Sequence, residues 1–455
     1  MTAERRAKKN LCGGATGRVR GEFGDLFRVT ATHTLYLCYF GLREPLVQTQ
    51  VLPYLRELVR GGVRVSLLTF EPRFREAWTP EEIERERARL ADEGISWHAR
   101  AYHKRPSLPA TLYDVAVGAR LARKLIGSEG VNVLHARGHV PALMAALAKR
   151  ARPATRMVFD IRGFMPEEYT DAGVWKAGGR LYRGVKRVEK FLLASADAFV
   201  VLTERAREIM FAAGADADER GRPVEVIPCC VDFRRFAAAD AASRDELRRG
   251  LGVEGRRVVV YVGALGGWYM TEEMARFLAA AHREDPTTFS LILTQSDPSL
   301  ISTRLAALGV AGEDFFVGKV APDEVPRYLR ASDAALSFIR ACYSKLSSSP
   351  TKIAEYLAAG LPVVTGAGVG DVDELVETER VGVVVRDFTD EAFRDALRRV
   401  EELRREGDLA VRCREVAERR FDIARVGGAR YRRLYERLRV ADRGLRVGEG
   451  ADSDV

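Results

Sequence analysis

The strongest constraint on this chain is a repeated alternation of short apolar runs and helical patterns, which extends from about residue 34 to residue 420. Runs rich in Val, Ile and aromatic residues predict buried strands, and the segments between them carry apolar residues at helical spacing. Strands that alternate with helices in this way form parallel sheets covered by helices. The sequence therefore predicts an α/β fold.

A small, polar stretch marked by Gly and Pro, residues 212–223, divides the predicted strands into two series. The expected strands are 35–40, 63–70, 131–136, 157–161 and 199–202 before it, and 258–263, 289–294, 335–338, 362–365 and 381–385 after it. Because a single core stops growing beyond about 250 to 300 residues, two doubly wound domains are favoured over one large sheet. Ligand is then expected in the cleft between them, at the carboxyl ends of the strands.

The net charge of +9 is concentrated in two short segments, residues 1–20 and 175–190, each with six basic residues and one acidic residue. In the second segment the basic residues recur at spacings of three or four opposite apolar ones, which predicts an amphipathic cationic helix. An ordinary core-packed helix with a solvated face has the same pattern. The concentrated charge favours reversible docking on an anionic membrane surface, and the absence of a basic face with interleaved aromatics argues against nucleic acid as a partner.

The six cysteines show no C-x-x-C spacing, so neither a zinc site nor a disulfide framework is expected. No apolar run approaches the roughly 20 residues that cross a bilayer, and no secretory signal follows the charged N-terminus. We expect a cytoplasmic protein with reduced thiols, peripheral on the inner face of the cell membrane.

The most informative stretch is residues 347–376. Pro350 can begin a helix that Gly360 ends, and Lys352 and Glu355 lie near its positive end. A cation beside free backbone N–H groups favours a phosphate, and a nearby carboxylate can accept ribose hydroxyls. Taken alone, an exposed ion pair on an ordinary helix explains the spacing equally well.

A glycine-rich turn follows, with Gly366, Gly368 and Gly370. Such a turn lets backbone amides approach an anion. It is not a G-x-G-x-x-G fingerprint, and a plain strand-to-helix turn remains the alternative.

Several segments resemble the retaining glycosyltransferases of family 4, the group 1 glycosyl transferases with the GT-B fold, and they occur along the chain in the order that the family has. They are 347–376, VLPYLRELVRGGVRVSLLTFE (51–71), VIPCCVDFRRF (226–236) and YVGALGGWY (261–269). The resemblance implies two Rossmann-like domains facing a cleft. With it we expect a basic, disordered arm over 1–30, an acceptor-binding domain over 31–221, a nucleotide-sugar-binding domain over 222–425, and a C-terminal helix with an acidic tail over 426–455.

The resemblance also assigns residues to the donor. Glu355 matches the family's ribose-binding carboxylate, and Lys352 falls where a cation can reach the diphosphate. Ser347 stands where the family has a first Glu, and Gly266 and Gly267 stand where it often has a basic pair. The expected donor-binding set is Gly266, Gly267, Ser347, Ser349, Lys352, Glu355, Gly368 and Gly370.

The acceptor is expected in the first domain. Arg162 follows a predicted strand in a loop where the family commonly has a catalytic His, and it can stabilise a departing phosphate or bind a carboxylated sugar; a structural salt bridge is the alternative. The expected acceptor-side residues are Gln48, His135, Arg137, Glu167 and Glu168. The candidates for catalysis are Arg162, Lys352 and Glu355.

The function implied is transfer of a hexose, with retention, from a nucleotide diphosphate sugar to a hydroxyl of a lipid-linked or polysaccharide acceptor. No metal and no cofactor beyond this co-substrate are expected. Two alternatives stay open: a GT-B enzyme that resembles nucleotide-sugar 2-epimerases, and a non-catalytic scaffold that has lost the first Glu at Ser347.

Overall fold

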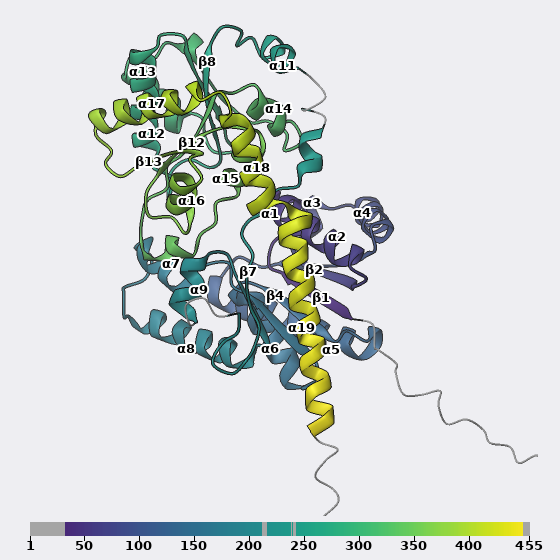
Figure 1. The fold of residues 1–455 in the computed structure, drawn as a ribbon. Coiled ribbons are helices and arrows are strands. Elements are labelled where there is room, and N and C mark those ends of the chain that lie inside the picture. Colours follow the sequence, from purple (N-terminus) through teal and green to yellow (C-terminus); the bar gives the residue numbers. More distant parts are fainter. Residues whose placement is uncertain (1–31, 212–215, 238, 240–242, 449–455) are drawn as a thin grey trace, which may run out of the picture. The chain divides into compact units, whose positions relative to one another are not determined.

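The computed structural model describes residues 32–211, 216–237, 239 and 243–448. The expected N-terminal arm (1–30) and the acidic tail beyond residue 448 lie outside the described residues. The described chain confirms the predicted α/β class and contains two parallel sheets (Figure 1).

The first sheet has seven parallel strands in the order β3-β2-β1-β4-β5-β6-β7. Its register pairs Leu35 with Ser66 on one side and with Leu134 on the other. The strands are β1 (His33–Cys38), β2 (Arg64–Pro72), β3 (Ile95–Tyr102), β4 (Val133–Arg137), β5 (Arg156–Asp160), β6 (Ala198–Val201) and β7 (Val224–Val226). The strand order reverses between β1 and β4, and this reversal opens a crevice at their carboxyl ends.

Alternate residues of β1 enter different cores: Tyr36 and Cys38 face one helical layer, and Leu35 and Leu37 face the other. The first layer holds α1 (Pro45–Gln50), α2 (Leu52–Arg60) and α4 (Pro80–Asp92), and the second holds α5 (Ser107–Glu129), α6 (His139–Arg150) and α8 (Arg180–Ser195). The short helices of this domain are α3 (Phe74–Ala77), α7 (Met165–Asp171) and α9 (Glu204–Met210).

The second sheet has six parallel strands in the order β10-β9-β8-β11-β12-β13. They are β8 (Arg257–Val262), β9 (Thr288–Leu293), β10 (Phe315–Gly318), β11 (Ala334–Ser337), β12 (Val363–Gly366) and β13 (Gly382–Val385). One face packs on α12 (Thr271–Glu284), α13 (Ser299–Ala307) and α17 (Asp390–Arg405), and the other on α14 (Val325–Arg330), α15 (Thr351–Ala358), α16 (Val372–Thr378) and α18 (Leu409–Phe421). The remaining turns of helix are η1 (Phe233–Phe236), α11 (Arg244–Gly250), η2 (Gly312–Asp314) and η3 (Tyr343–Ser347).

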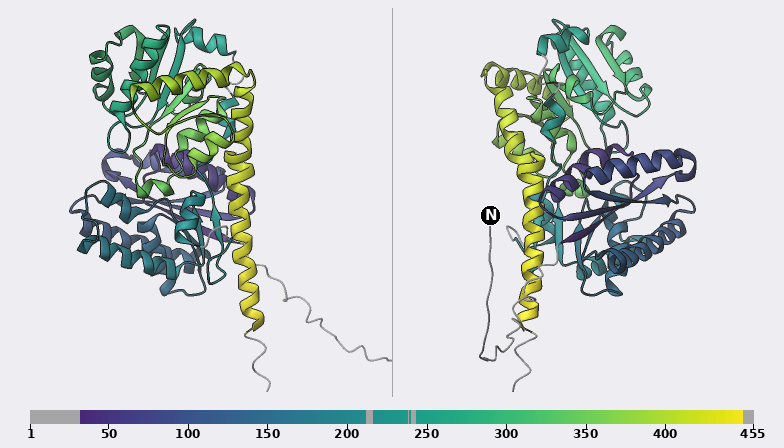
Figure 2. Two further views of the ribbon diagram at one scale, coloured as in Figure 1. Left: turned by 60° about the vertical axis from the view of Figure 1, so that its left-hand side comes forward. Right: turned by 90° about the vertical axis from the view of Figure 1, so that its right-hand side faces the viewer.

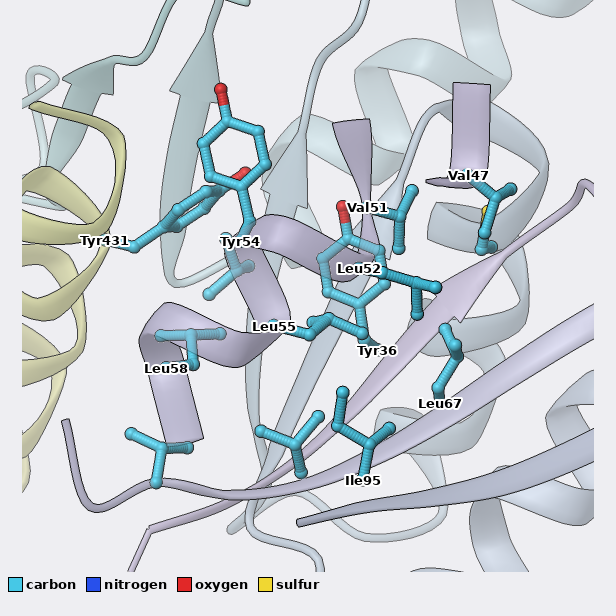
Figure 3. Packing of buried hydrophobic residues seen from close by; sticks show 14 of the residues in the cluster. Tyr36, Val47, Val51, Leu52, Tyr54, Leu55, Leu58, Leu67, Ile95 and Tyr431 are labelled. Atoms are coloured by element: carbon cyan, nitrogen blue, oxygen red, sulfur yellow. The ribbon is translucent and has the colours of Figure 1, made fainter. Parts of the chain in front are cut away.

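The chain returns to the first domain at its C-terminal end. After η4 (Ile423–Gly428), helix α19 (Ala429–Gly448) runs along the first domain (Figure 2). Tyr431, Leu434, Tyr435 and Leu438 are buried in the core that contains α2. In Figure 3, Tyr431 of α19 lies against Tyr54 of α2, with ring centroids 5.3 Å apart.

One expected boundary needs correction. The sequence predicts the start of the second domain at residue 222, but β7 (Val224–Val226) pairs with β6 and completes the first sheet. The chain therefore crosses to the second domain only after Val226. This three-residue strand is too short to give a strand signal in the sequence. None of the helices in the described ranges is long and apolar enough to cross a bilayer.

The packing of α19 against the first-domain core predicts that a cavity at this contact lowers the stability of the domain. Leu434 is fully buried, so Leu434→Ala is expected to lower the free energy of unfolding of the first domain by about 2–4 kcal/mol. Urea denaturation followed by a probe in the first domain measures this. Leu300→Ala, at a residue that is 38% exposed, is the control and should change it by less than about 0.5 kcal/mol. A Leu434 variant as stable as the control would show that α19 adds nothing to this core.

Candidate active site

A cavity of about 510 Å³ lies between the carboxyl ends of the two sheets. Its first-domain wall comes from the segments that follow β1, β4 and β5, and its second-domain wall from the segments that follow β8 and β11 and the start of α15. The main lining side chains are Phe40, Leu46, Arg137, His139, Arg162 and Glu168 on one side and Trp268, Tyr269, Ile339, Lys345, Ser349 and Thr351 on the other. The cleft is thus where the alternation of strands and helices predicted it.

A fully buried carboxylate, Asp160, organises the first-domain wall. It lies at the end of β5 and accepts hydrogen bonds from Arg162 Nη1 at 3.4 Å and from Tyr431 Oη at 3.1 Å. Arg137 Nη1 lies 3.8 Å from the same carboxylate. Burial alone would raise the pKa of Asp160, but Arg162, His135 and Arg137 together hold that pKa well below its usual value. Asp160 is therefore ionised at neutral pH.

The positive charge around Asp160 exceeds its negative charge. Arg137 and Arg162 are both cationic, and burial lowers the pKa of the nearby His135, so that its ring stays neutral at pH 7. Among the described residues, Nη1 of Arg137 is buried and has no hydrogen-bond partner. A surplus positive charge and an unused donor at the cavity wall suit an anionic ligand.

The second-domain wall presents an aromatic surface beside a cation. Lys345 Nζ lies 4.2 Å from the ring centroid of Trp268 and 3.0 Å from Glu168 Oε1 of the first domain. Phe40, Trp268 and Tyr269 add apolar surface to the same cavity. Sugar rings present C–H faces and hydroxyl edges, so this combination of aromatic faces and charged groups can bind a glycosyl group.

The segment that ends η3 contacts the first domain across the cleft. Ser347 Oγ accepts a hydrogen bond from the Phe164 amide at 3.1 Å and donates to the Ser344 carbonyl at 2.8 Å. Ser349 Oγ accepts from the Cys229 amide at 3.1 Å. Ser347 is 2% exposed, so the residue that replaces the family's first Glu serves here as an interdomain contact.

Lys352 is buried and does not line the cavity. Its Nζ lies 4.2 Å from the ring centroid of Tyr261 and 4.5 Å from that of Tyr269, under the backbone of Gly263. Desolvation lowers the pKa of Lys352 to about 7, an effect that Glu355 opposes. The sequence predicts this amine in the first turns of a helix, where it can reach a phosphate; in the structure it is instead enclosed by the rings of Tyr261 and Tyr269.

The other donor-side residues are placed apart from the cavity. Glu355 forms an ion pair of 2.7 Å with Arg235. Three glycines expected to offer free amides have partners in the protein: the Gly266 amide donates to Thr271, that of Gly368 to Asp373, and that of Gly370 to the Lys345 carbonyl of η3. Gly267 belongs to the same turn as Gly266, whose next residues, Trp268 and Tyr269, do reach the cavity.

Three of the acceptor-side candidates lie outside the cavity lining. His135 is fully buried beneath it, with Nδ1 2.9 Å from Tyr435 Oη. Glu167 faces α8, where it accepts from Tyr182 at 2.9 Å and pairs with Lys186 at 3.1 Å. Gln48 donates to the Leu42 carbonyl at 2.6 Å. Of the predicted residues, the structure brings together Arg137, Arg162, Glu168 and Ser349.

Sequence reasoning missed several residues of this site. Asp160 lies in the motif FDIRG near the end of the predicted strand 157–161, and that position was a usable signal for a residue at the cleft. Lys345, Trp268 and His139 had no pattern that distinguished them. Tyr431 lies 271 residues from Asp160 along the chain, so only the fold brings it there. In the part of the chain that the structure describes, no group of three or more His, Cys, Asp or Glu residues is placed to hold a metal ion.

Comparison with protein families identifies the chain. A family described as "Glycosyl transferase 4-like domain" matches residues 47–230, and one described as "Glycosyl transferases group 1" matches residues 256–402. These matches cover both domains, and the chain belongs to the group 1 glycosyltransferases. Spore coat protein SA of Bacillus subtilis (strain 168) is 27% identical over 162 residues, which are 34% of this chain and only 41% of that relative.

Solved structures agree on the fold. Anabaena HepE in complex with UDP and glucose superposes with a TM-score of 0.62 at 16% identity, over 90% of this chain and 99% of that one. Sucrose-phosphate synthase from Thermosynechococcus elongatus gives 0.65 at 16% identity, over 90% and 100%. A protein from Listeria monocytogenes described as a UDP-N-acetylglucosamine 2-epimerase gives 0.54 at 12% identity, over 87% and 93%. The predicted GT-B fold is confirmed.

The enclosure of Lys352 predicts a pH-dependent stability difference. Its pKa in the folded protein, about 7, lies below the ordinary value of 10.5, so between these values the unfolded chain binds one proton more. The stability of the wild type relative to Lys352→Met should therefore rise by about 1.4 kcal/mol per pH unit from pH ~7 to pH ~10.

Urea denaturation at a series of pH values measures this difference. Lys319→Met, at an exposed lysine, is the control and should show no such slope. If the difference in unfolding free energy between the wild type and Lys352→Met does not change with pH, the Lys352 ammonium is solvated in the folded wild type.

Proposed function

We propose that the protein transfers a sugar, with retention and without a metal, from a nucleotide diphosphate sugar to a hydroxyl of a glycan or glycolipid acceptor. The observation that carries this proposal is the pair of arginines, Arg137 and Arg162, that share one buried carboxylate at the cleft. Their surplus charge lies where a diphosphate would leave. A glycosyltransferase accelerates its reaction by stabilising the charge that builds up on that leaving group.

The chemistry of arginine supports this role. A guanidinium offers several donors in a fixed plane, which match phosphate oxygens, and it keeps its charge at every physiological pH. The cleft also lies between two walls that can hold one substrate each, which lowers the entropic cost of bringing them together. UDP and glucose are bound to Anabaena HepE, which shares this fold, so a nucleotide sugar is the donor class we propose here.

For the donor we propose the second domain. Glu355 would accept the ribose hydroxyls once Arg235 turns from it, and Lys352 would reach the diphosphate only when the Tyr269 ring moves aside. Gly266, Gly267, Gly368 and Gly370 would then position the loops that surround the donor. The Ser347 contact across the cleft would have to break and reform as the domains open and close.

For the acceptor we propose the first-domain wall, with Glu168 as its polar group inside the cleft. His135 would act from beneath by holding the wall in place, and Gln48 and Glu167 would act only at its edges. We further propose that the protein works on the cytoplasmic side of the cell membrane, where a lipid-linked acceptor is available, and that the cationic helix α8 assists its docking there.

Replacement of Arg162 tests the central step. The first measurement is thermal stabilisation of the wild type by a panel of nucleotides and nucleotide sugars, beginning with UDP and UDP-glucose. For the nucleotide that stabilises most, Arg162→Ala should weaken binding by about 1.5–3 kcal/mol in calorimetry, because one charge-assisted contact to the diphosphate is lost.

Arg183→Ala on α8 is the matched control and should bind as the wild type does. Equal binding by Arg162→Ala would remove that residue from the donor site. Product analysis then tests the reaction class: a glycosylated acceptor supports transfer, whereas an altered free sugar without any acceptor would contradict it in favour of epimerase-like chemistry. Binding to no nucleotide in the panel would favour the scaffold.

A further inference from the structure

Helices α5, α6 and α8 form one outer layer of the first domain, with α6 between the other two (Figure 1). Helices α5 and α6 directly follow the carboxyl ends of β3 and β4 and so begin at the edge of the sheet that carries the cleft, and α8 follows α7, which lies after β5. This layer has an unusual charge distribution. Its three carboxylates are Asp114 and Glu189, which are buried, and the half-buried Glu129 at the last residue of α5.

The exposed surface of this layer is cationic. Helix α5 exposes Arg120, Arg123 and Lys124, and α6 exposes Arg150. Helix α8 exposes Arg180, Arg183, Arg187 and Lys190, none of which forms an ion pair with a residue in the described ranges. Lys186, which the sequence grouped with them, is instead paired with Glu167 and Glu189. Most solvated helices carry both signs of charge, whereas this surface carries exposed cations without exposed carboxylates between them. It is therefore suited to an anionic partner.

Large apolar side chains are exposed at the cleft end of the same layer. Leu108 is 60% exposed, Leu112 53% and Tyr113 58%, all in the first turns of α5, and Leu181 at the start of α8 is 59% exposed. Lys104 and Arg105 directly precede α5 and form no ion pair with described residues. Between Ile95 and Ser128 the only carboxylate is Asp114, and it is occupied by Tyr39 at 2.7 Å and His103 at 2.6 Å.

We propose that the α5–α6–α8 layer is a membrane-docking face, in which the first turns of α5 insert apolar side chains below the headgroups of an anionic bilayer. The proposal deepens the membrane partner of the proposed function, which rested on α8 alone. Apolar side chains flanked by lysine and arginine match the interface of a bilayer, where the chains are buried and the cations meet lipid phosphates. Docking by this end would bring the cleft to the membrane surface, within reach of a lipid-linked acceptor.

Two other occupants fit the observations less well. A symmetric second copy would place this face against itself and bring like charges together, with no exposed carboxylate to compensate them. A nucleic acid would meet the cations but would leave Leu108 and Leu112 in contact with charged phosphates. An anionic lipid surface satisfies both the charged and the apolar side chains.

Vesicle co-sedimentation tests the proposal. The full chain is mixed with vesicles of phosphatidylcholine alone or of phosphatidylcholine with phosphatidylglycerol. Binding should require the anionic lipid, and Arg120→Glu with Lys124→Glu should weaken it by about fivefold for each cation lost. Leu108→Asn with Leu112→Asn should weaken it by about tenfold, and this loss should persist in high salt because it is apolar.

Leu300→Asn with Leu308→Asn, at two exposed leucines of the second domain, is the control and should bind vesicles as the wild type does. The proposal would be overturned if both α5 variants bind anionic vesicles as well as the wild type does. It would also be overturned if the wild type binds both kinds of vesicle equally, or binds neither. The proposal would also be overturned if the wild type sediments as a dimer, the Leu108→Asn, Leu112→Asn variant sediments as a monomer, and that variant still binds vesicles. A second copy of the chain would then cover this face.

Nucleotide binding by the same variants separates this proposal from the proposed function. It should be unchanged in solution, because no substituted residue lies in the cleft. Retained nucleotide binding and transfer with no vesicle binding would contradict only the docking face. Vesicle binding without any nucleotide binding would contradict only the glycosyltransferase proposal.

Discussion

The site depends on one buried negative charge, the carboxylate of Asp160. An ionised carboxylate in a protein interior is costly unless cations and hydrogen-bond donors surround it. Arg137, Arg162 and Tyr431 supply them from β4, the loop after β5 and helix α19. Because these groups come from distant parts of the sequence, the carboxylate fixes the floor of the cleft only when the whole first domain, including α19, is assembled. The two arginines then retain a surplus positive charge that faces the space between the domains.

This arrangement connects the C-terminal helix α19 to the wall of the cleft. Helix α19 belongs to the first core through Tyr431, Leu434 and Tyr435, and the hydroxyl of Tyr435 also meets His135 at 2.9 Å. The second domain adds its own contact across the cleft through Ser347, and Ser349 contacts the Cys229 amide in the connection between the domains. The departure from the family pattern at Ser347 thus has a structural counterpart, since a short hydroxyl fits between the Phe164 amide and the Ser344 carbonyl.

The sequence predicted the fold more completely than the site. The α/β class and most strands followed from hydrophobic runs, but two edge strands were not predicted: β3, in which polar residues alternate with apolar ones, and β10, a partly buried strand of four residues. The positions of Arg137, Arg162 and Glu168 after predicted strands and the family resemblance at Ser349 pointed to the cleft, and these four residues line the cavity. The burial of Lys352 was not predicted, since a helical position does not reveal the rings of Tyr261 and Tyr269 that enclose it. The role of Asp160 required partners that only the fold brings together.

The most direct measurement of the central claim is amide hydrogen exchange, followed by mass spectrometry, with and without the nucleotide sugar that stabilises the protein most. Binding at the arginine pair should slow exchange in the first-domain segments around Gly138 and Gly163 together with the second-domain segment 345–351, because all three line the cavity. Protection confined to segments outside the cleft, or to the second domain alone, would contradict the claim that Arg137 and Arg162 receive the diphosphate.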